Sequence, residues 1–191
     1  QNGNLKVNIP ENALYDNALF YAESKISYNK NQLSDTYILG TSDIILRNAI
    51  QVSLPMPKKI NEKTLFGRWE YGAFKIQEGY FEDGMFYFST ETLGNYAFYE
   101  DTTAPKIESK ALINNAVFYK KELSVKIKIT DALAGFDFDK TCVYFDGVWH
   151  PFEHDYKNGY LYYAFPELPS EGKHQIYVET RDYAGNISEK T

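Results

Sequence analysis

Two histidines four residues apart make HPFEH, His150 to His154, the first stretch to examine for chemistry. With a glutamate between them, this pattern supplies two zinc ligands and a general base when the segment is helical, because a helix brings such residues within roughly 6 Å of each other. Pro151 and the flanking turn dipeptides indicate strands instead. Four residues of strand span about 13 Å, too far for both imidazoles to bind one zinc at about 2 Å. We therefore predict no metal site here and expect two surface histidines on a β-meander; His174 alone remains as a further imidazole.

Three aspartates lie near a glycine in the segment DALAGFDFD, a composition that suggests calcium. Calcium loops place acidic ligands at alternate positions ahead of the glycine, and Asp131, Asp137 and Asp139 do not follow that spacing. A turn between strands also explains the segment, with the Asp131 carboxylate bonded to nearby backbone and Gly135 forming the turn. We favour the turn, and calcium binding by the three aspartates stays open.

No segment carries the signature of a nucleophilic or phosphate-binding enzyme site, since neither a G-x-S-x-G elbow nor a P-loop occurs. Cys142, the single cysteine, lies on a predicted strand between Thr141 and Val143, which indicates a buried, inert thiol and excludes a disulfide within the chain. Carboxylate pairs for glycoside hydrolysis lie far apart in sequence, so no pair is selected. We predict a chain that is not an enzyme and needs no cofactor. A hydrolase using scattered carboxylates or His150 and His154 is the least favoured alternative.

Aromatic residues make up 17% of the chain, with 17 tyrosines and 13 phenylalanines. On a strand, Trp149 would project opposite to His150, and Tyr160 and Tyr162 opposite to Leu161. Exposed aromatic rings could stack on sugar rings or contact another protein, whereas buried ones would fill a core or a contact between domains. Trp149, Tyr160 and Tyr162 are therefore the candidate binding residues, and packing is the alternative.

Composition limits the possible partners and the fold class. The chain has 191 residues, 43% of them hydrophobic, and no apolar run near the roughly 18 residues that a membrane-spanning helix needs. The net charge is −6, and neither half carries a basic patch, which argues against nucleic acid or an anionic membrane as a partner. The aromatic content and the closely spaced glycines and prolines predict an all-β fold.

Strand patterns repeat on both sides of the polar stretch EDTTAPKI, residues 100–107. Pro105 cannot donate to a strand ladder and biases Ala104 to an extended conformation, so we predict a linker at 101–105 between two tandem β-sandwich domains, 1–100 and 106–191. Within Thr141–Phe165 the turn dipeptides Asp146-Gly147 and Asn158-Gly159 predict a three-strand meander. The other predicted strand regions are Leu5–Ile9, Ala18–Ser24, Asp43–Pro55, the hairpin Gly79–Ser89, Thr92–Tyr99, Leu123–Thr130 and His174–Asp182.

The turn motifs of the second half resemble the immunoglobulin-like modules at the C-terminal end of lysostaphin-like cell-envelope metallopeptidases of the Bacteroidetes group. Such modules open with a D-T-x-x-P joint and contain a T-D-x-x-x-G turn and a D-x-x-G-N turn. The matching positions are Asp101 and Pro105, Thr130, Asp131 and Gly135, and Asp182, Gly185 and Asn186. The resemblance implies that the second domain is immunoglobulin-like.

The zinc-binding H-x-x-x-D and H-x-H motifs of that peptidase family do not occur in this chain. The resemblance therefore implies a non-catalytic accessory or targeting region outside the cytoplasm, in the periplasm or at the cell surface. It would position a peptidoglycan metallopeptidase domain, with a cell-wall or surface glycan, or the partner domain of the same protein, as its partner. The alternative is a carbohydrate-binding or adhesion module that uses Trp149, Tyr160 and Tyr162.

The segments Ile9–Tyr21 and Phe88–Asp101 resemble the sandwich that precedes this module in the same proteins. The first half also has a weaker similarity to domains of the ZU5 and GAIN type. Some of those domains cleave themselves at a His-Phe-Ser site, whose counterpart here is Tyr87-Phe88-Ser89. Because tyrosine stands in place of the histidine, we do not expect self-cleavage.

Overall fold

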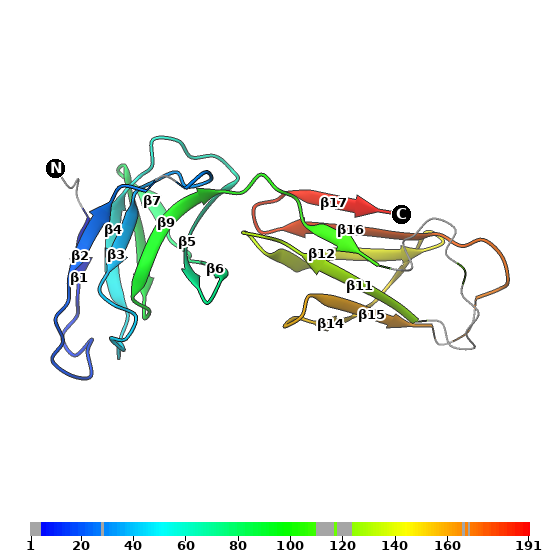
Figure 1. Ribbon diagram of the computed structural model, residues 1–191, viewed down its shortest axis with the longest axis horizontal. Coiled ribbons are helices and arrows are strands. Elements are labelled where there is room, and N and C mark those ends of the chain that lie inside the picture. The colour runs from blue at the N-terminus through cyan, green and yellow to red at the C-terminus, as the bar shows by residue number, and fades with distance from the viewer. Residues whose placement is uncertain (1–4, 28, 110–116, 118–123, 166, 168) are drawn as a thin grey trace. The chain divides into compact units, whose positions relative to one another are not determined.

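The computed structural model describes residues 5–27, 29–109, 117, 124–165, 167 and 169–191. Across these residues the chain is all-β, with seventeen strands in four antiparallel sheets and no helix. The chain divides into two compact units, Gln1–Asp101 and Thr102–Thr191. Each unit contains two of the sheets and its own buried apolar cluster, so the prediction of tandem β-sandwiches is confirmed (Figure 1).

The first unit pairs a four-stranded sheet, in the order β1-β4-β8-β7, with a five-stranded sheet, in the order β2-β3-β9-β5-β6. The predicted hairpin at 79–89 is present as β7 and β8, and its turn residues Asp83 and Gly84 both have positive φ, 47° and 75°. The strands of this unit are β1 Lys6–Asn8, β2 Ala22–Lys25, β3 Thr36–Leu39, β4 Ile50–Pro55, β5 Thr64–Glu70, β6 Ala73–Ile76, β7 Tyr80–Glu82, β8 Met85–Thr90 and β9 Gly94–Glu100.

Aromatic rings fill the centre of the first unit. Phe66 on β5 lies with its ring centroid 4.7 Å from that of Phe86, 4.9 Å from Phe88 and 4.6 Å from Phe98. All four side chains are at most 5% exposed. The high aromatic content of the sequence is therefore used here for packing between the two sheets.

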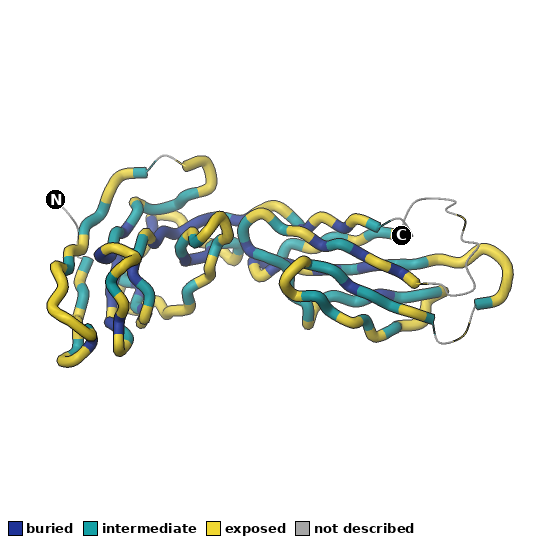
Figure 2. Tube along the Cα trace, turned by 60° about the horizontal axis from the view of Figure 1, so that its bottom comes forward, coloured by how far each residue is buried: buried dark blue, intermediate teal, exposed yellow. Residues whose placement is uncertain are grey.

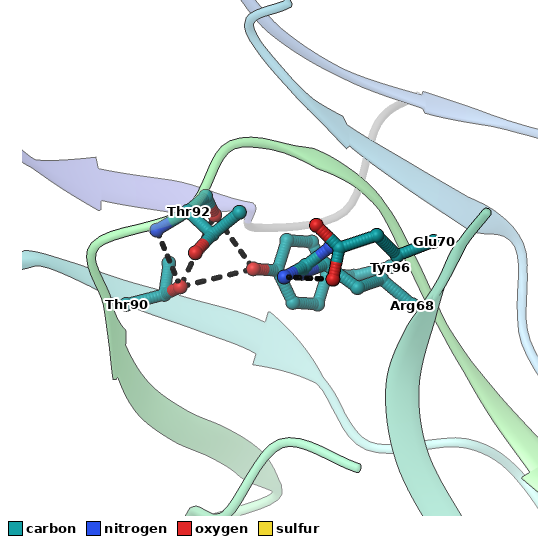
Figure 3. Close-up of polar contacts among 5 residues, drawn as sticks. All are labelled: Arg68, Glu70, Thr90, Thr92 and Tyr96. Atoms are coloured by element: carbon teal, nitrogen blue, oxygen red, sulfur yellow. Dashed lines mark hydrogen bonds and ion pairs between the residues drawn. The ribbon is translucent and has the colours of Figure 1, made fainter. Parts of the chain in front are cut away.

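A buried tyrosine fixes the crossing from β8 to β9, which belong to different sheets (Figure 3). The hydroxyl of Tyr96, a fully buried residue near the start of β9, donates to the carbonyl of Thr92 at 2.6 Å and lies 2.9 Å from the hydroxyl of Thr90. A tyrosine at such a crossing that bonds back to the backbone a few residues upstream is a tyrosine corner. Burial raises the pKa of Tyr96. Arg68 and Glu70 lie beside the ring and form an ion pair at 3.2 Å.

The second unit pairs the sheet β10-β11-β15-β14 with the sheet β13-β12-β16-β17. When the strands are lettered along the chain, the first sheet reads A, B, E and D across its width, and the second reads C′, C, F and G, as in an immunoglobulin domain. The prediction of an immunoglobulin-like second domain is therefore confirmed. The strands are β10 Lys106–Glu108, β11 Ser124–Thr130, β12 Phe136–Phe145, β13 Val148–His150, β14 Glu153–Asp155, β15 Tyr160–Ala164, β16 Ile176–Asp182 and β17 Ile187–Lys190.

The core of the second unit follows the period of two along its strands. On β11, Val125, Ile127 and Ile129 are buried, whereas Lys126 lies on the outer face. Figure 2 shows buried and exposed residues alternating along strands. The predicted strand started at Leu123, which lies outside the described residues. Leu161, Val143 and Val178 complete the cluster from β15, β12 and β16, together with Ile107.

The predicted three-strand meander at 141–165 is wrong. Its first turn, Asp146-Gly147, joins β12 to β13 in one sheet, but β14 and β15 belong to the other sheet. The chain changes sheets at Pro151 and Phe152, between β13 and β14. Pro151 has no N–H to continue a ladder, and the Phe152 ring packs against the core between the sheets. The crossing therefore places a residue without an N–H at the end of one ladder and an aromatic ring against the core.

Candidate functional site

The three candidate binding residues lie on the outer faces of two different sheets of the second unit. Tyr160 and Tyr162 are on β15, and Trp149 is on β13. The structure therefore brings the two tyrosines together but does not bring Trp149 to them.

Lysine side chains cover the two tyrosines on the β15 face. The rings of Tyr160 and Tyr162 lie 5.8 Å apart, and the Lys126 Nζ is 3.8 Å from the first ring centroid and 5.1 Å from the second. Lys128 Nζ is 5.4 Å from the Tyr160 ring. A hydrogen bond to Tyr162 raises the pKa of Lys126. Because these rings already hold cations, a sugar would have to displace ammonium groups in order to stack on them.

Trp149 belongs to a row of three aromatic residues on the other sheet. In the strand register Trp149 stands opposite Tyr144 on β12, and Tyr144 stands opposite Tyr177 on β16. The neighbouring residues Val143 and Val178 are buried, so the row lies on the outer face. Trp149 is 56% exposed, and the rings of Tyr144 and Tyr177 lie 5.9 Å apart.

A shallow open hollow of about 370 Å³ adjoins this row. Its lining residues are Tyr144, Gly147, Gln175, Tyr177 and Glu179. The Tyr177 hydroxyl donates to Glu179 Oε2 at 3.1 Å. Loss of solvation, together with the nearby glutamates, raises the pKa of Tyr177 to about 12, so this phenol keeps its proton at any ordinary pH. The hollow thus combines two tyrosine side chains with the side chains of a glutamine and a glutamate.

A hydrogen-bonded brace holds one edge of the hollow in place. Asp146, in the turn before Gly147, accepts a hydrogen bond from the backbone N–H of Gln175 through Oδ1, at 2.8 Å. Its Oδ2 lies 2.6 Å from His174 Nδ1. His174 Nε2 lies 2.7 Å from the Ser170 carbonyl. The hydrogen bond to Asp146 raises the pKa of His174, and the same bond lowers the pKa of Asp146. Both ring nitrogens face acceptors, which favours the doubly protonated imidazolium.

The sequence did not indicate this grouping. Tyr144 and Tyr177 were not candidates. The alternation of residues along a strand separates its two faces, but it does not identify the distant strand that pairs with it. Cys142, expected to be buried, is half-buried: it stands two residues before Tyr144 on β12 and opposite Glu179, on the outer face.

The histidines of HPFEH are separated by the change of sheet. His150 ends β13 and His154 lies on β14, in different sheets. They are half-buried rather than on the surface: the His150 ring lies 4.9 Å from Tyr163, and the His154 ring 4.8 Å from Phe138. Both imidazoles thus pack among aromatic rings, which the expected meander would have left exposed.

The aspartate segment forms the predicted turn. Asp131 Oδ1 accepts hydrogen bonds from the backbone N–H groups of Leu133 and Gly135, at 3.0 and 2.8 Å, and Gly135 has a φ of 72°. Asp137 likewise accepts from the backbone N–H of Asp139 at 2.9 Å. These carboxylates bond to local backbone, as the turn interpretation requires.

Comparison with known families concerns the first unit. Residues 1–101 match the Zu5-like domain family over their full length. The chain belongs to the Zu5-like domain family. This confirms the similarity of the first half to ZU5-type domains.

The counterpart of the self-cleavage site, Tyr87-Phe88-Ser89, lies on β8 of this Zu5-like domain. Ser89 is exposed and paired with Gln51, and its carbonyl accepts a hydrogen bond from the Gln77 side chain at 3.1 Å. Tyr87, in place of the histidine, stacks on Tyr80 with ring centroids 5.3 Å apart.

Two further searches add no relative to this assignment, since neither curated proteins nor solved structures gave a match to the chain. In the part of the chain that the structure describes, we find no helix with the length and apolar character to cross a membrane.

Proposed function

We propose that this chain is a non-catalytic accessory or targeting region of an exported cell-envelope protein, acting outside the cytoplasm. Its task is to hold a peptidoglycan metallopeptidase domain, whose zinc motifs are not among these residues, near the cell wall. The observation that carries the proposal is the second unit. Its immunoglobulin strand order coincides with turn motifs at the positions that the resemblance to lysostaphin-like peptidases requires.

The turns of those motifs have the conformation that their residue types favour. Asp182 accepts hydrogen bonds from the backbone and side-chain N–H groups of Asn186, both at 2.7 Å, and Gly185 between them has a φ of 78°. Asp131 and Gly135 form the corresponding turn after β11. Because both turns are fixed by buried or half-buried carboxylates, the motifs support a rigid module. A rigid module suits positioning better than a flexible tether would.

Sedimentation with isolated peptidoglycan tests the proposal. The purified full chain is mixed with sacculi and centrifuged, and release of soluble fragments from dye-labelled sacculi is followed in parallel. We expect the chain to pellet with the sacculi and to release no dye. A chain that stays in the supernatant like an inert control protein would refute the targeting role, and dye release would refute the non-catalytic role.

A carbohydrate-binding module is the second candidate function, and one observation favours it. The aromatic row and hollow on the β13-β12-β16 face combine one exposed and two half-buried aromatic side chains with polar groups. The two functions are compatible, because an accessory region can reach the wall by binding a glycan.

A further inference from the structure

We infer that the outer face of the sheet β13-β12-β16-β17 binds a neutral glycan, whose pyranose rings stack on Tyr144, Tyr177 and Trp149 and whose hydroxyl groups bond to Glu179 and Gln175. The inference deepens the proposed function and rests on it for the source of the glycan, because it names the ligand class and the site.

The row of rings supplies the stacking surface. Trp149, Tyr144 and Tyr177 stand side by side on three adjacent hydrogen-bonded strands, so the row extends over two strand spacings, or about 10 Å. The C–H face of a pyranose is flat and apolar, and it packs on the negative face of an aromatic ring. A row of this length accommodates two linked sugar rings.

The polar groups of the hollow match the hydroxyls of a sugar. Glu179 receives the Tyr177 hydroxyl on Oε2, and a carboxylate has about four acceptor positions, so it can accept sugar O–H groups as well. The Gln175 amide both donates and accepts. The hollow of about 370 Å³ lies at the small end of the ligand sites of roughly 300–1,000 Å³.

Charge decides that the glycan is neutral. Glu179 on β16 stands opposite Glu189 on β17, one row from the aromatic residues, and both glutamates contribute to the raised pKa of Tyr177. A uronate, sialate or phosphate group would meet these carboxylates at short range. Arg181, exposed on the same face of β16, lies a row further along. The carboxylates next to the hollow therefore select against anionic sugars.

The same carboxylates argue against a protein as the occupant. A protein surface pressed on this face would remove Glu179 and Glu189 from water, which is unfavourable unless the protein supplies a donor or a cation to each carboxylate. A glycan brings hydroxyl donors to each carboxylate and leaves the open side of the hollow in water. The shape of the hollow is fixed before any ligand binds, because the hydrogen bonds of Asp146 to His174 and Gln175 hold the turn that carries Gly147.

Titration with soluble oligosaccharides tests the inference. The full chain is titrated with N-acetylglucosamine hexamer and with cellohexaose, both neutral, and with galacturonate hexamer, which is acidic. Calorimetry gives the affinities, and Trp149 emission in a Trp69→Phe chain reports on the site. Tyr144→Ala and Glu179→Gln are the site variants, and the double variant Tyr160→Ala/Tyr162→Ala is the control on the opposite sheet. Circular dichroism establishes that each variant is folded, and Glu179→Gln preserves shape should Tyr144→Ala fail to fold.

We expect at least one neutral hexamer to bind and to change Trp149 emission. Its Kd should rise at least tenfold in Tyr144→Ala and several-fold in Glu179→Gln, and it should stay within twofold of wild type in the control. No binding up to about 10 mM, well above the ~1 mM of weak specific complexes, would overturn the inference. Equal loss in the control, or tighter binding of the galacturonate, would overturn it too.

The sacculus assay separates this inference from the proposed function. If no hexamer binds, but wild type and Tyr144→Ala pellet equally with sacculi, targeting stands and the glycan site is refuted. If the hexamer binds at the site but no chain pellets, the glycan site stands and the targeting role is refuted.

Discussion

Replacing Tyr96 by phenylalanine should destabilise the Zu5-like unit while leaving its core packing intact. The change removes one hydroxyl, which donates to the Thr92 carbonyl at 2.6 Å and lies 2.9 Å from the Thr90 hydroxyl, in a residue that is 0% exposed. The Thr92 carbonyl keeps one donor, because the Thr90 hydroxyl lies 3.1 Å from it. The crossing from β8 to β9 then loses the bond that ties it to the second sheet.

The Tyr96 hydroxyl takes part in two hydrogen bonds, and losing each of them costs about 0.5–1.5 kcal/mol, so the change should cost about 1–3 kcal/mol in all. Tyr37→Phe is the matched control, because Tyr37 is also buried, at 4% exposed, and its hydroxyl lies 3.4 Å from the Pro55 carbonyl. That distance is beyond the usual range of about 2.5–3.0 Å for such a bond, so the same change should cost less than about 1 kcal/mol.

The two tryptophans allow each unit to be followed separately, since Trp69 lies in the first unit and Trp149 in the second. In a Trp149→Phe chain the emission comes from Trp69, which packs 5.5 Å from Phe74 and 6.4 Å from Tyr99. Urea unfolding then gives the stability of the Zu5-like unit. At a slope of about 2 kcal/mol per molar, Tyr96→Phe should lower the midpoint by about 0.5–1.5 M.

A Tyr96→Phe shift no larger than that of Tyr37→Phe would refute the tyrosine-corner reasoning. So would an equal shift of the Trp149 transition in a Trp69→Phe chain, because the lost bonds lie within the first unit.

Two further predictions concern the second unit. Asp146 raises the pKa of His174, so the stabilisation from this pair is complete below the ordinary histidine value near pH 6.5 and is lost as pH rises through the raised value. The pKa of Asp146 is lowered, so the same stabilisation is also lost at acid pH, below about 4. Thermal unfolding of the second unit should therefore shift to lower temperature from pH 6 to pH 8.5, and a shift of the same size in His174→Gln would contradict this assignment. Gly159→Ala should destabilise the unit far more than Gly147→Ala in urea unfolding: both glycines have positive φ, 69° and 79°, but a Cβ at Gly159 would lie 2.5 Å from the Ile129 carbonyl, whereas a Cβ at Gly147 would meet nothing within 4 Å. Equal midpoints for the two variants would show that the backbone at Gly159 yields without cost.

Local features of the fold could be predicted because each depends on a few consecutive residues. The alternation in SVKIKIT placed Val125, Ile127 and Ile129 in the core, since side chains on a strand alternate between faces. The Asp83-Gly84 turn adopts the positive φ angles that its residue types tolerate. The all-β class followed from such patterns, and the immunoglobulin-like second unit was implied by the family resemblance that the turn motifs carry.

The pairing of distant strands was decided by the tertiary structure alone. Tyr144 and Tyr177 are more than thirty positions apart in the sequence and meet because β12 and β16 pair in one register; a slip of one residue would have turned the row into the core. The same cause separated Trp149 from Tyr160 and Tyr162. The chain leaves its sheet after β13, where Phe152 packs against the core and β14 joins the other sheet. The sequence by itself therefore determined the all-β class and many of the strands, but not β3, β5 or β6, and three-dimensional packing determined which aromatic side chains share a face.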